Sequence, residues 1–374
     1  MELYELIAPC HFGLEAVMKR EILDLGYEIE RVEDGKVTFL ADAEGIAYAN
    51  LFLRTTERIL LKVGQVHAET YDELFEATKA LQWEKFIPKN GKFWVTKANS
   101  IKSKLFSPSD IQSIMKKAIV ERLKQVYHME WFPEDGAQYP IRVSILKDEV
   151  TIGLDTSGVS LHKRGYRKLT AKAPITETLA AALIMLTPWK GDRILVDPFC
   201  GSGTFPIEAA MMAADIAPGL NRSFLAEQWT HLVPKKCWMD AAEDARYRIR
   251  NDIETDIQGF DIDGDVIKSA RENAKLAGVD HLIHFQKRSV SELNHPKKYG
   301  FVITNPPYGE RIMEKQEAEQ LYRLFGEAWR KTENWKLYLL SSHTEFERTF
   351  GKTADKKRKL YNGMIKCDLF MYLK

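Results

Sequence analysis

The strongest candidate for ligand binding is the run Asp-Pro-Phe-Cys-Gly-Ser-Gly-Thr at residues 197–204, which directly follows an apolar segment. Gly201 and Gly203 allow the backbone to turn tightly and to approach a ligand closely. Asp197 would end the preceding strand, at the sheet edge where ligands of open α/β folds bind. The run lacks the lysine of a Walker loop, and Pro206 stands where a dinucleotide-binding loop needs its third glycine. An ordinary strand-to-helix turn is the alternative.

A second polar motif, Gly-Phe-Asp-Ile-Asp at residues 259–263, also follows an apolar segment. An acid at the end of a second strand can accept hydrogen bonds from both ribose hydroxyls of a nucleoside, and Asp261 is the candidate. Asp263 is better explained as the N-cap of the next helix. In the alternative interpretation, both acids are only caps or turn residues.

The third motif is Asn305-Pro306-Pro307-Tyr308, again directly after an apolar segment. Two prolines hold the backbone extended, so the Asn305 side chain and the next carbonyl can together accept both hydrogens of an exocyclic NH₂ group. This localises the nitrogen lone pair, and preorganised dipoles stabilise the charge that develops on nitrogen. Tyr308 can stack on the planar target, as flipped bases stack on aromatic side chains. A proline-rich turn is the alternative.

These motifs need a parallel sheet to bring them together. After residue 172, strand-like and helical segments alternate, which predicts an α/β, doubly wound parallel sheet. The carboxyl ends of its strands meet at one edge, so the three motifs should lie side by side. We expect strands at 193–196, 257–260, 283–286, 301–304, 335–340 and 367–373, helices at 205–214, 266–277 and 317–331, and a basic loop at 352–359.

The first 165 residues mix short strands and helices, which predicts one or two small α+β domains with a boundary near residue 60. Residues 141–147 and 149–154 should form a hairpin around Lys147-Asp148. The other expected elements are strands at 3–8, 36–40, 59–66 and 93–98 and helices at 14–25, 43–51, 71–80 and 109–127.

The motifs resemble those of one known family. Residues 197–204, Phe-Asp-Ile-Asp at 260–263 and Asn-Pro-Pro-Tyr-Gly-Glu-Arg at 305–311 resemble class I S-adenosylmethionine (SAM) methyltransferases that act on exocyclic amines. Residues 161–167 and 173–179 resemble the junction of THUMP-domain RNA guanine-N2 methyltransferases. The chain is similar in particular to the THUMP and catalytic portion of 23S rRNA methyltransferases of the RlmL type.

The resemblance implies a Rossmann-like methyltransferase domain at 166–374, preceded by a ferredoxin-like domain at 1–60 and a THUMP RNA-binding domain at 61–165. It implies SAM as the cofactor. The target base would be held by Asn305, Pro306 and Tyr308. Family members usually carry an acid for the adenine amino group after the third strand, a neighbourhood that Ser289 occupies here. The other implied cofactor-binding residues are Asp197, Phe199, Gly201, Ser202, Gly203, Thr204, Asp261 and Ile262, with Pro174 and Thr176 near the methionine end.

Basic residues could hold the RNA backbone, although a solvated surface explains any single lysine better. A cluster between the domains could orient the RNA: Lys163, Arg164, Arg167, Lys168 and Lys172. A third cluster, in the loop expected at 352–359, is as well explained by solvation. In the front half, Trp83, Phe86 and Trp94 accompany Lys85, Lys89, Lys92, Lys97, Lys102, Lys104, Lys116, Lys117, Arg122 and Lys124.

Composition fits a cytoplasmic protein without a membrane segment. The 374 residues hold 54 Lys+Arg and 53 Asp+Glu, so a histone-like or strongly acidic chain is excluded. The four cysteines are widely spaced and the histidines form no ligand set, so we expect neither disulfides nor a metal. The longest apolar stretches, such as 179–186, are far shorter than the roughly 20 residues that span a bilayer.

The sequence therefore predicts a SAM-dependent RNA methyltransferase that modifies N2 of guanine, with 23S rRNA favoured and tRNA open as substrate. An adenine-N6 DNA methyltransferase uses the same Asn-Pro-Pro-Tyr chemistry, and a THUMP-like front half is what favours RNA. A protein glutamine methyltransferase and a non-catalytic RNA-binding or assembly factor are further alternatives.

Overall fold

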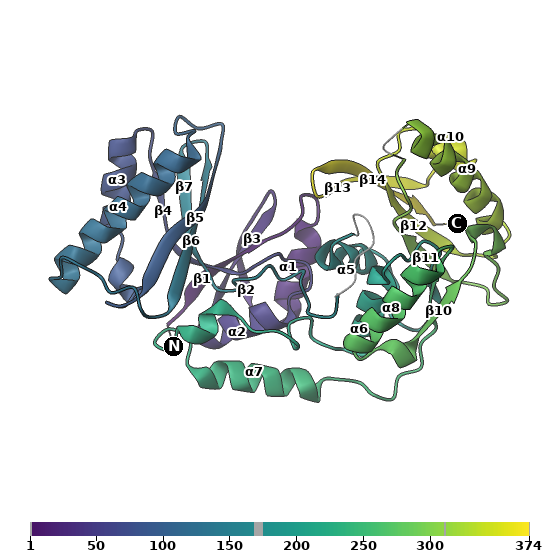
Figure 1. The fold of residues 1–374 in the computed structure, drawn as a ribbon, viewed down its shortest axis with the longest axis horizontal. Coiled ribbons are helices and arrows are strands. Elements are labelled where there is room, and N and C mark those ends of the chain that lie inside the picture. The colour runs from purple at the N-terminus through teal and green to yellow at the C-terminus, as the bar shows by residue number, and fades with distance from the viewer. Residues whose placement is uncertain (1, 168–174, 310–311, 374) are drawn as a thin grey trace.

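The computed structural model describes residues 2–167, 175–309 and 312–373. Two seven-stranded sheets form two lobes that follow each other along the longest axis of the molecule (Figure 1). The N-terminal lobe contains β1 (Tyr4–Pro9), α1 (Glu15–Asp24), β2 (Glu28–Glu33), β3 (Lys36–Ala41), α2 (Ala43–Phe52), β4 (Leu60–His67), α3 (Tyr71–Ala80), β5 (Lys92–Ile101), α4 (Pro108–Tyr127), β6 (Gln138–Leu146) and β7 (Glu149–Asp155).

The remaining elements are α5 (Glu177–Met185), β8 (Leu195–Asp197), α6 (Thr204–Ala213), α7 (Lys235–Tyr247), β9 (Ile257–Asp261), α8 (Gly264–Leu276), β10 (Ile283–Lys287), β11 (Phe301–Thr304), α9 (Ile312–Trp329), β12 (Lys336–Ser341), α10 (Phe346–Phe350), β13 (Lys356–Asn362) and β14 (Ile365–Tyr372). Short 3₁₀ turns lie at Trp83–Lys85, Leu225–Gln228, Asp280–Leu282 and Val290–Glu292.

The N-terminal sheet has the order β2-β3-β1-β4-β7-β6-β5. Strand β4 pairs antiparallel with both β1 and β7, so the sheet runs without a break across residue 60. The hairpin expected around Lys147-Asp148 is confirmed. Both residues have positive φ, 52° and 66°, as the tight turn between β6 and β7 requires.

The C-terminal sheet has the order β10-β9-β8-β11-β12-β14-β13. Strands β8 to β12 are parallel, and β14 runs antiparallel beside β12. Apolar side chains alternate between the two faces of the sheet. Phe205 of α6 and Ala270 of α8 pack on one face, and Phe325 of α9 and Phe350 of α10 pack on the other. The expected Rossmann-like fold, preceded by an α+β region, is therefore confirmed.

Residues 356–359 were expected to lie in a loop, and that expectation is wrong, because they belong to β13. Their sequence Lys-Lys-Arg-Lys has no alternation of apolar and polar residues, so nothing in it indicates a strand. Strand β13 is the edge of its sheet, and among the described strands it pairs with β14 alone. Charged side chains are typical of edge strands, because they prevent pairing with a second chain.

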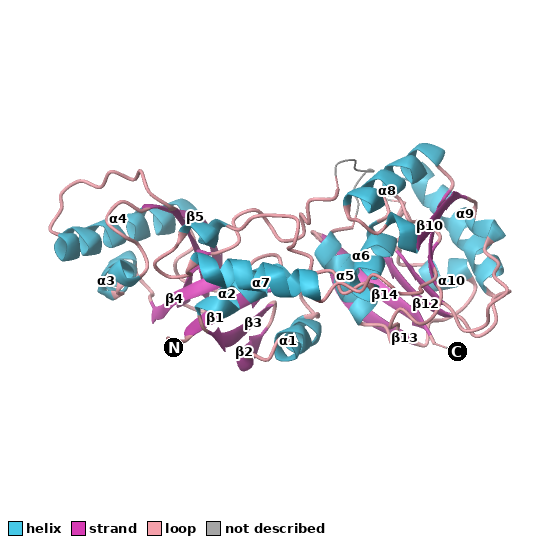
Figure 2. Cartoon of the chain, turned by 90° about the horizontal axis from the view of Figure 1, so that it is seen from below, coloured by secondary structure: helices cyan, strands magenta, loops and turns pink. Residues whose placement is uncertain are grey.

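A segment of the second half packs into the N-terminal core. Trp229 is fully buried and stacks on Tyr139, with 5.0 Å between ring centroids. Its indole Nε1 donates to the carbonyl of Gln138 at 2.8 Å. Ala241 and Ala245 of α7 join the same core, and α7 lies along α2 (Figures 1 and 2). The segment between α6 and β9, which contains α7, therefore packs against the first lobe.

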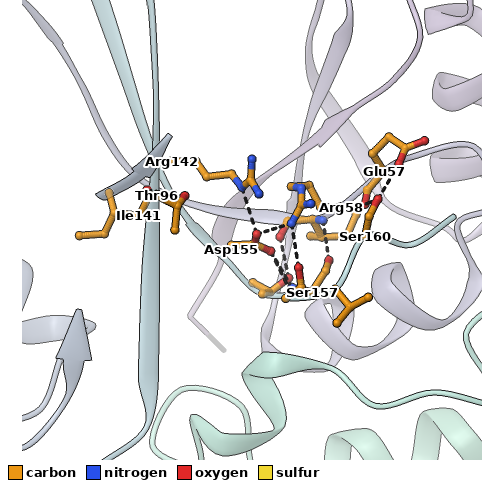
Figure 3. A network of polar contacts seen from close by, with 12 residues as sticks. Glu57, Arg58, Thr96, Ile141, Arg142, Asp155, Ser157 and Ser160 are labelled. Atoms are coloured by element: carbon orange, nitrogen blue, oxygen red, sulfur yellow. Dashed lines mark hydrogen bonds and ion pairs between the residues drawn. The ribbon is translucent and has the colours of Figure 1, made fainter. Parts of the chain in front are cut away.

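A network of polar contacts lies just before β4, where it meets the end of β7 (Figure 3). Arg58 and Arg142 both pair with the carboxylate of Asp155, which is almost inaccessible to solvent. Next to them, Glu57 accepts a hydrogen bond from Ser160 Oγ at 2.6 Å and one from Thr178 Oγ1 on α5. Because Thr178 belongs to the C-terminal lobe, Glu57 ties the two lobes together. Among the described helices, none is both long and apolar enough to cross a membrane.

Candidate active site

Three strands bring the predicted motifs to one sheet edge. Asp197 ends β8, Asp261 ends β9, and Asn305 follows β11 directly. Strand β8 lies between the other two and runs parallel to both. The three side chains therefore start from the same, carboxyl edge of the sheet, as the spacing predicted.

Asp261 is hydrogen-bonded to the glycine turn at residues 201–203. The backbone N–H of Gly201 donates to Asp261 Oδ2 at 3.1 Å, and the N–H of Asp263 donates to Oδ1 at 3.0 Å. Gly201 has a φ of +52°, and the space beside its Cα is open. Each carboxylate oxygen keeps a second lone pair, so Asp261 can still accept ribose hydroxyls in the position predicted for it.

The second glycine of the turn is required by packing. Gly203 has a φ of +89°, and a Cβ there would come within 3.2 Å of Phe285, Ala270 and Ile207. Asn273 of α8 supports the same turn, because its Nδ2 donates to the carbonyl of Ser202 at 3.1 Å. The sequence reasoning missed Asn273, since it lies in the middle of an ordinary amphipathic helix.

Asp197 links the ends of β8 and β11. Its Oδ1 accepts hydrogen bonds from Thr304 Oγ1 at 2.6 Å and from the N–H of Phe199 at 3.1 Å. The residue is 1% exposed, and burial raises the pKa of its carboxyl to about 7. Because Thr304 immediately precedes Asn305, this pair helps to set where the third motif begins.

The raised pKa of Asp197 predicts a pH-dependent stability. The folded chain binds this proton more tightly than the unfolded chain, so the group stabilises the fold below its ordinary value of 3.8. That contribution is lost as the pH rises to about 7. Relative to an Asp197→Asn variant, we expect the wild-type free energy of unfolding to fall by up to about 1.4 kcal/mol per pH unit in this window.

Urea titrations of both proteins at several pH values between these limits measure the difference. A wild-type-minus-variant difference that stays constant across the window would contradict the assignment to Asp197.

Asn305 and Tyr308 contact each other directly. The Tyr308 hydroxyl donates to Asn305 Oδ1, and it accepts a hydrogen bond from Asn362 Nδ2 at 3.2 Å. Burial raises the pKa of the Tyr308 phenol, so the hydroxyl keeps its proton. Cys367 Sγ lies 3.6 Å from the same oxygen. The amide oxygen of Asn305 is thereby fixed in direction, with one lone pair left to accept from a substrate.

The sequence reasoning missed Asn362, although a signal was present. Residues 362–363 are Asn-Gly, a strong hairpin signal, and Gly363 has a φ of +61°.

Pro306 is buried, and the next proline accepts a hydrogen bond from Tyr322 through its carbonyl. The predicted stacking of a base on Tyr308 uses the ring rather than the hydroxyl and stays a prediction.

The side chains beside Asp261 suit a flat apolar ring. Ile262 is 71% exposed although it is a large hydrophobic residue. Ser289 caps the short turn at Val290–Glu292, where its Oγ accepts from the N–H of Ser291 at 3.3 Å. The ring of Phe199 instead packs edge-on against Phe325 of α9, with 5.4 Å between centroids. The place of Phe199 among the cofactor-binding residues stays a prediction.

Arg167 organises the start of α5 and α6. Its guanidinium donates to Thr204 Oγ1 at 2.5 Å and to the carbonyl of Ile175 at 3.0 Å, and it pairs with Glu177 at 3.2 Å. Thr176 is the N-cap of α5 and accepts from the N–H of Leu179. Pro174, the other residue expected at the methionine end, lies outside the described residues.

The residues around the turn fit SAM. Ser202 Oγ and Glu177 Oε2 are buried, and neither has a hydrogen-bond partner among the residues that the structure describes. A carboxylate oxygen suits the ammonium group of the methionine end, and Glu177 connects with the turn through Arg167 and Thr204. Asp261 suits the ribose, and the exposed Ile262 suits the adenine ring.

One arginine of the cluster between the domains does not face solvent, so the expectation that it orients RNA is wrong. Arg164 is 3% exposed and pairs with the fully buried Glu208 at 3.4 Å. Arg167 is partly buried and forms an ion pair with Glu177. Lys163 is exposed, and Lys168 and Lys172 lie outside the described residues.

The basic face of the front half is partly neutralised. Four of its predicted residues pair with a glutamate and are better explained as surface ion pairs: Lys104 with Glu69, Lys116 with Glu134, Arg122 with Glu84, and Lys124 with Glu130. The exposed lysines at 85, 89, 92, 97, 102 and 117 remain candidates for phosphate contact.

The fold and site define a class I methyltransferase that carries an N-terminal THUMP-containing lobe. Three family models match the chain: an RlmL ferredoxin-like domain over residues 5–60, a THUMP domain over 68–155, and an RMKL-like methyltransferase domain over 164–370. The chain belongs to the RMKL-like methyltransferase family. The resemblance seen in the sequence is thereby confirmed.

Two curated relatives illustrate the family. YpsC of Bacillus subtilis is 47% identical over all of this chain and 96% of its own length. A protein of Cellvibrio japonicus named ribosomal RNA large subunit methyltransferase K/L is 32% identical over 99% of this chain. The match spans only 51% of that longer relative.

Solved structures are similar over the whole chain. A possible methylase from Clostridium difficile 630 is 52% identical with a TM-score of 0.96, covering 99% of this chain and 98% of that one. A chain from Listeria monocytogenes, described as a predicted N6-adenine-specific DNA methylase, is 46% identical with a TM-score of 0.94, covering 100% and 96%. SMU.472, complexed with S-adenosylhomocysteine, is 42% identical with a TM-score of 0.93, covering 100% and 98%. The S-adenosylhomocysteine bound to SMU.472 is SAM without its methyl group, which agrees with SAM as the cofactor predicted from the sequence.

Proposed function

We propose that the protein is a cytoplasmic enzyme that transfers the methyl group of SAM to N2 of a guanine in structured RNA, with 23S rRNA as the favoured substrate. The observation that carries the proposal is the Asn305 amide oxygen, oriented by Tyr308 at the sheet edge that also holds Asp261. The THUMP match and the relatives named as ribosomal RNA methyltransferases support RNA as the substrate.

The reaction depends on holding and aligning the guanine amino group more than on a strong base. Asn305 Oδ1 already accepts one hydrogen from Tyr308 and can accept a second from the guanine amino group. The Pro306 carbonyl accepts the other amino hydrogen, so the nitrogen lone pair is no longer shared fully with the ring. When bound, SAM supplies an electrophilic sulfonium methyl. The protein holds the nitrogen in line with it, so that the sulfur–methyl bond breaks as the new C–N bond forms and S-adenosylhomocysteine leaves. The surplus proton then passes to water.

An adenine-N6 DNA methyltransferase is the second candidate, because the Listeria structure carries that description and adenine presents the same NH₂ group. The front half separates the two. A THUMP domain and exposed lysines on β5 and its flanks favour an RNA substrate over duplex DNA.

The test supplies purified protein with methyl-labelled SAM and either RNA or DNA from cells that lack the gene. The nucleosides released by digestion are then separated and identified. We expect labelled N2-methylguanosine from large-subunit rRNA. Labelled N6-methyladenine alone, or no product from any RNA, would overturn the proposal. Matched tRNA from the same cells distinguishes the two RNA classes.

A further inference from the structure

The hairpin of β13 and β14 extends well beyond the sheet edge that carries the site. Thr304 at the end of β11 is level with Leu339, which pairs with Phe370 of β14. From Phe370 to Ile365 the strand continues for five residues (370 − 365), which at about 3.4 Å per residue is about 17 Å. The tip of the hairpin therefore overhangs the position proposed for the target base.

The two faces of this hairpin have different partners. Asn362 and Cys367 point toward the site, where both contact the Tyr308 hydroxyl. Alternation along the strands places Lys359, Tyr361 and Lys366 on the opposite face, and Tyr361 pairs across the hairpin with Lys366. All three are exposed, and no carboxylate among the described residues forms an ion pair with either lysine. An aromatic ring thus lies between two lysines, of which Lys359 stands opposite Asp368 across the hairpin and Lys366 stands opposite Tyr361 itself.

A second aromatic side chain joins Tyr361 from the other lobe. Phe12 meets it edge to face, with 6.4 Å between ring centroids, and the two are 52% and 38% exposed. The loop that carries Phe12 is fixed, because Glu15 accepts hydrogen bonds from the N–H groups of Gly13 at 3.0 Å and Gly35 at 2.8 Å. The pair is therefore a preformed surface between the lobes.

We propose that Phe12, Lys359, Tyr361 and Lys366 bind the unpaired nucleotides that flank the target base, with a base against the aromatic pair and phosphates on the lysines. Stacking on aromatic side chains and contact with lysines are how proteins hold single-stranded RNA, whereas a duplex keeps its bases inside the stack. The three hairpin residues lie on the face that points away from Tyr308, and Asn362, the neighbour of Tyr361 along β13, supplies the continuity with the site. This inference rests on the proposed function and specifies that the target lies in an unpaired segment.

The test measures the affinity of the full chain for a fluorescein-labelled RNA hairpin with a long unpaired loop, and for a fully paired duplex of the same length. We expect Tyr361→Ala to weaken hairpin binding about tenfold and to leave duplex binding unchanged. Tyr361→Trp should restore the affinity. Lys366→Ala should reduce the slope of log affinity against log salt by about one, because one phosphate contact is lost.

Tyr299→Ala is the matched control, because Tyr299 is 57% exposed but precedes β11, at the opposite edge of the sheet. Equal loss of affinity in the two alanine variants, or an equal loss for hairpin and duplex, would overturn the inference, as would a wild type that binds neither RNA. Methylation of rRNA by the wild type is scored separately. The inference can therefore fail while the proposed function stands.

Discussion

Replacing Asn305 by alanine should lower the rate constant for methyl transfer to RNA by about a thousandfold and leave the affinity for SAM unchanged within about twofold. The variant loses the amide oxygen that accepts an amino hydrogen of the substrate, and with it the acceptor that the Tyr308 hydroxyl now uses. Single-turnover kinetics with saturating RNA measure the first quantity, and calorimetric titration with SAM measures the second.

Tyr308→Phe separates the two roles of this pair. It keeps the ring for stacking and removes only the hydroxyl that orients Asn305, so we expect a loss of about tenfold rather than a thousandfold. Asp261→Ala is the reciprocal control, since it should weaken SAM binding and spare the acceptor. If Asn305→Ala reduced SAM affinity as strongly as Asp261→Ala does, Asn305 would be a cofactor residue and the proposed mechanism would be wrong.

The arrangement of the candidate site could be predicted because the ends of strands can be recognised in the sequence. Asp197, Asp261 and Asn305 each follow a short apolar run, and parallel strands in a doubly wound sheet place such residues at one edge. Their distance along the chain does not matter, because the alternation of strands and helices determines the edge. That part of the site follows from local pattern alone.

Contacts that depend on register could not be inferred in the same way. The hydroxyl of Tyr308 meets Asn305 and Asn362 only because β14 runs antiparallel beside β12 and brings the hairpin tip over the site. The consecutive basic residues of β13 show no alternation of apolar and polar side chains, so the sequence did not indicate a strand there. For α7, amphipathic periodicity indicates a helix but does not indicate which lobe its apolar face covers.

Charge alone was also a poor guide to exposure. Arg164 and Arg167 stand among lysines in the sequence, which suggests a solvated cluster, yet both are held by carboxylates in the structure. The partner of Arg164, Glu208, is four residues into α6 and flanked by apolar residues. A glutamate in such a segment is itself a signal, because carboxylates are rarely buried without a partner.

Glu208→Ala should reduce the free energy of unfolding by about 3–5 kcal/mol, because it leaves the Arg164 guanidinium buried without its counter-charge. Burial opposes the charge of Arg164 most strongly, but Glu208, Tyr166 and Glu177 together outweigh it, so that the pKa of Arg164 is raised. Glu208 also accepts from the Tyr166 hydroxyl at 2.9 Å, so that group would lose its partner as well. Urea denaturation followed by fluorescence measures the change.

Asp240→Ala is the matched control, since it breaks a pair with Lys236 on the exposed side of α7 and should change stability far less. A double variant, Arg164→Met with Glu208→Leu, should recover much of the loss, because it removes both charges and keeps the volume filled. Arg164 also donates to the carbonyl of Arg54 at 2.6 Å in the N-terminal lobe. If Glu208→Ala were no more disruptive than Asp240→Ala, this buried pair would not be what joins the glycine-turn helix to the first lobe.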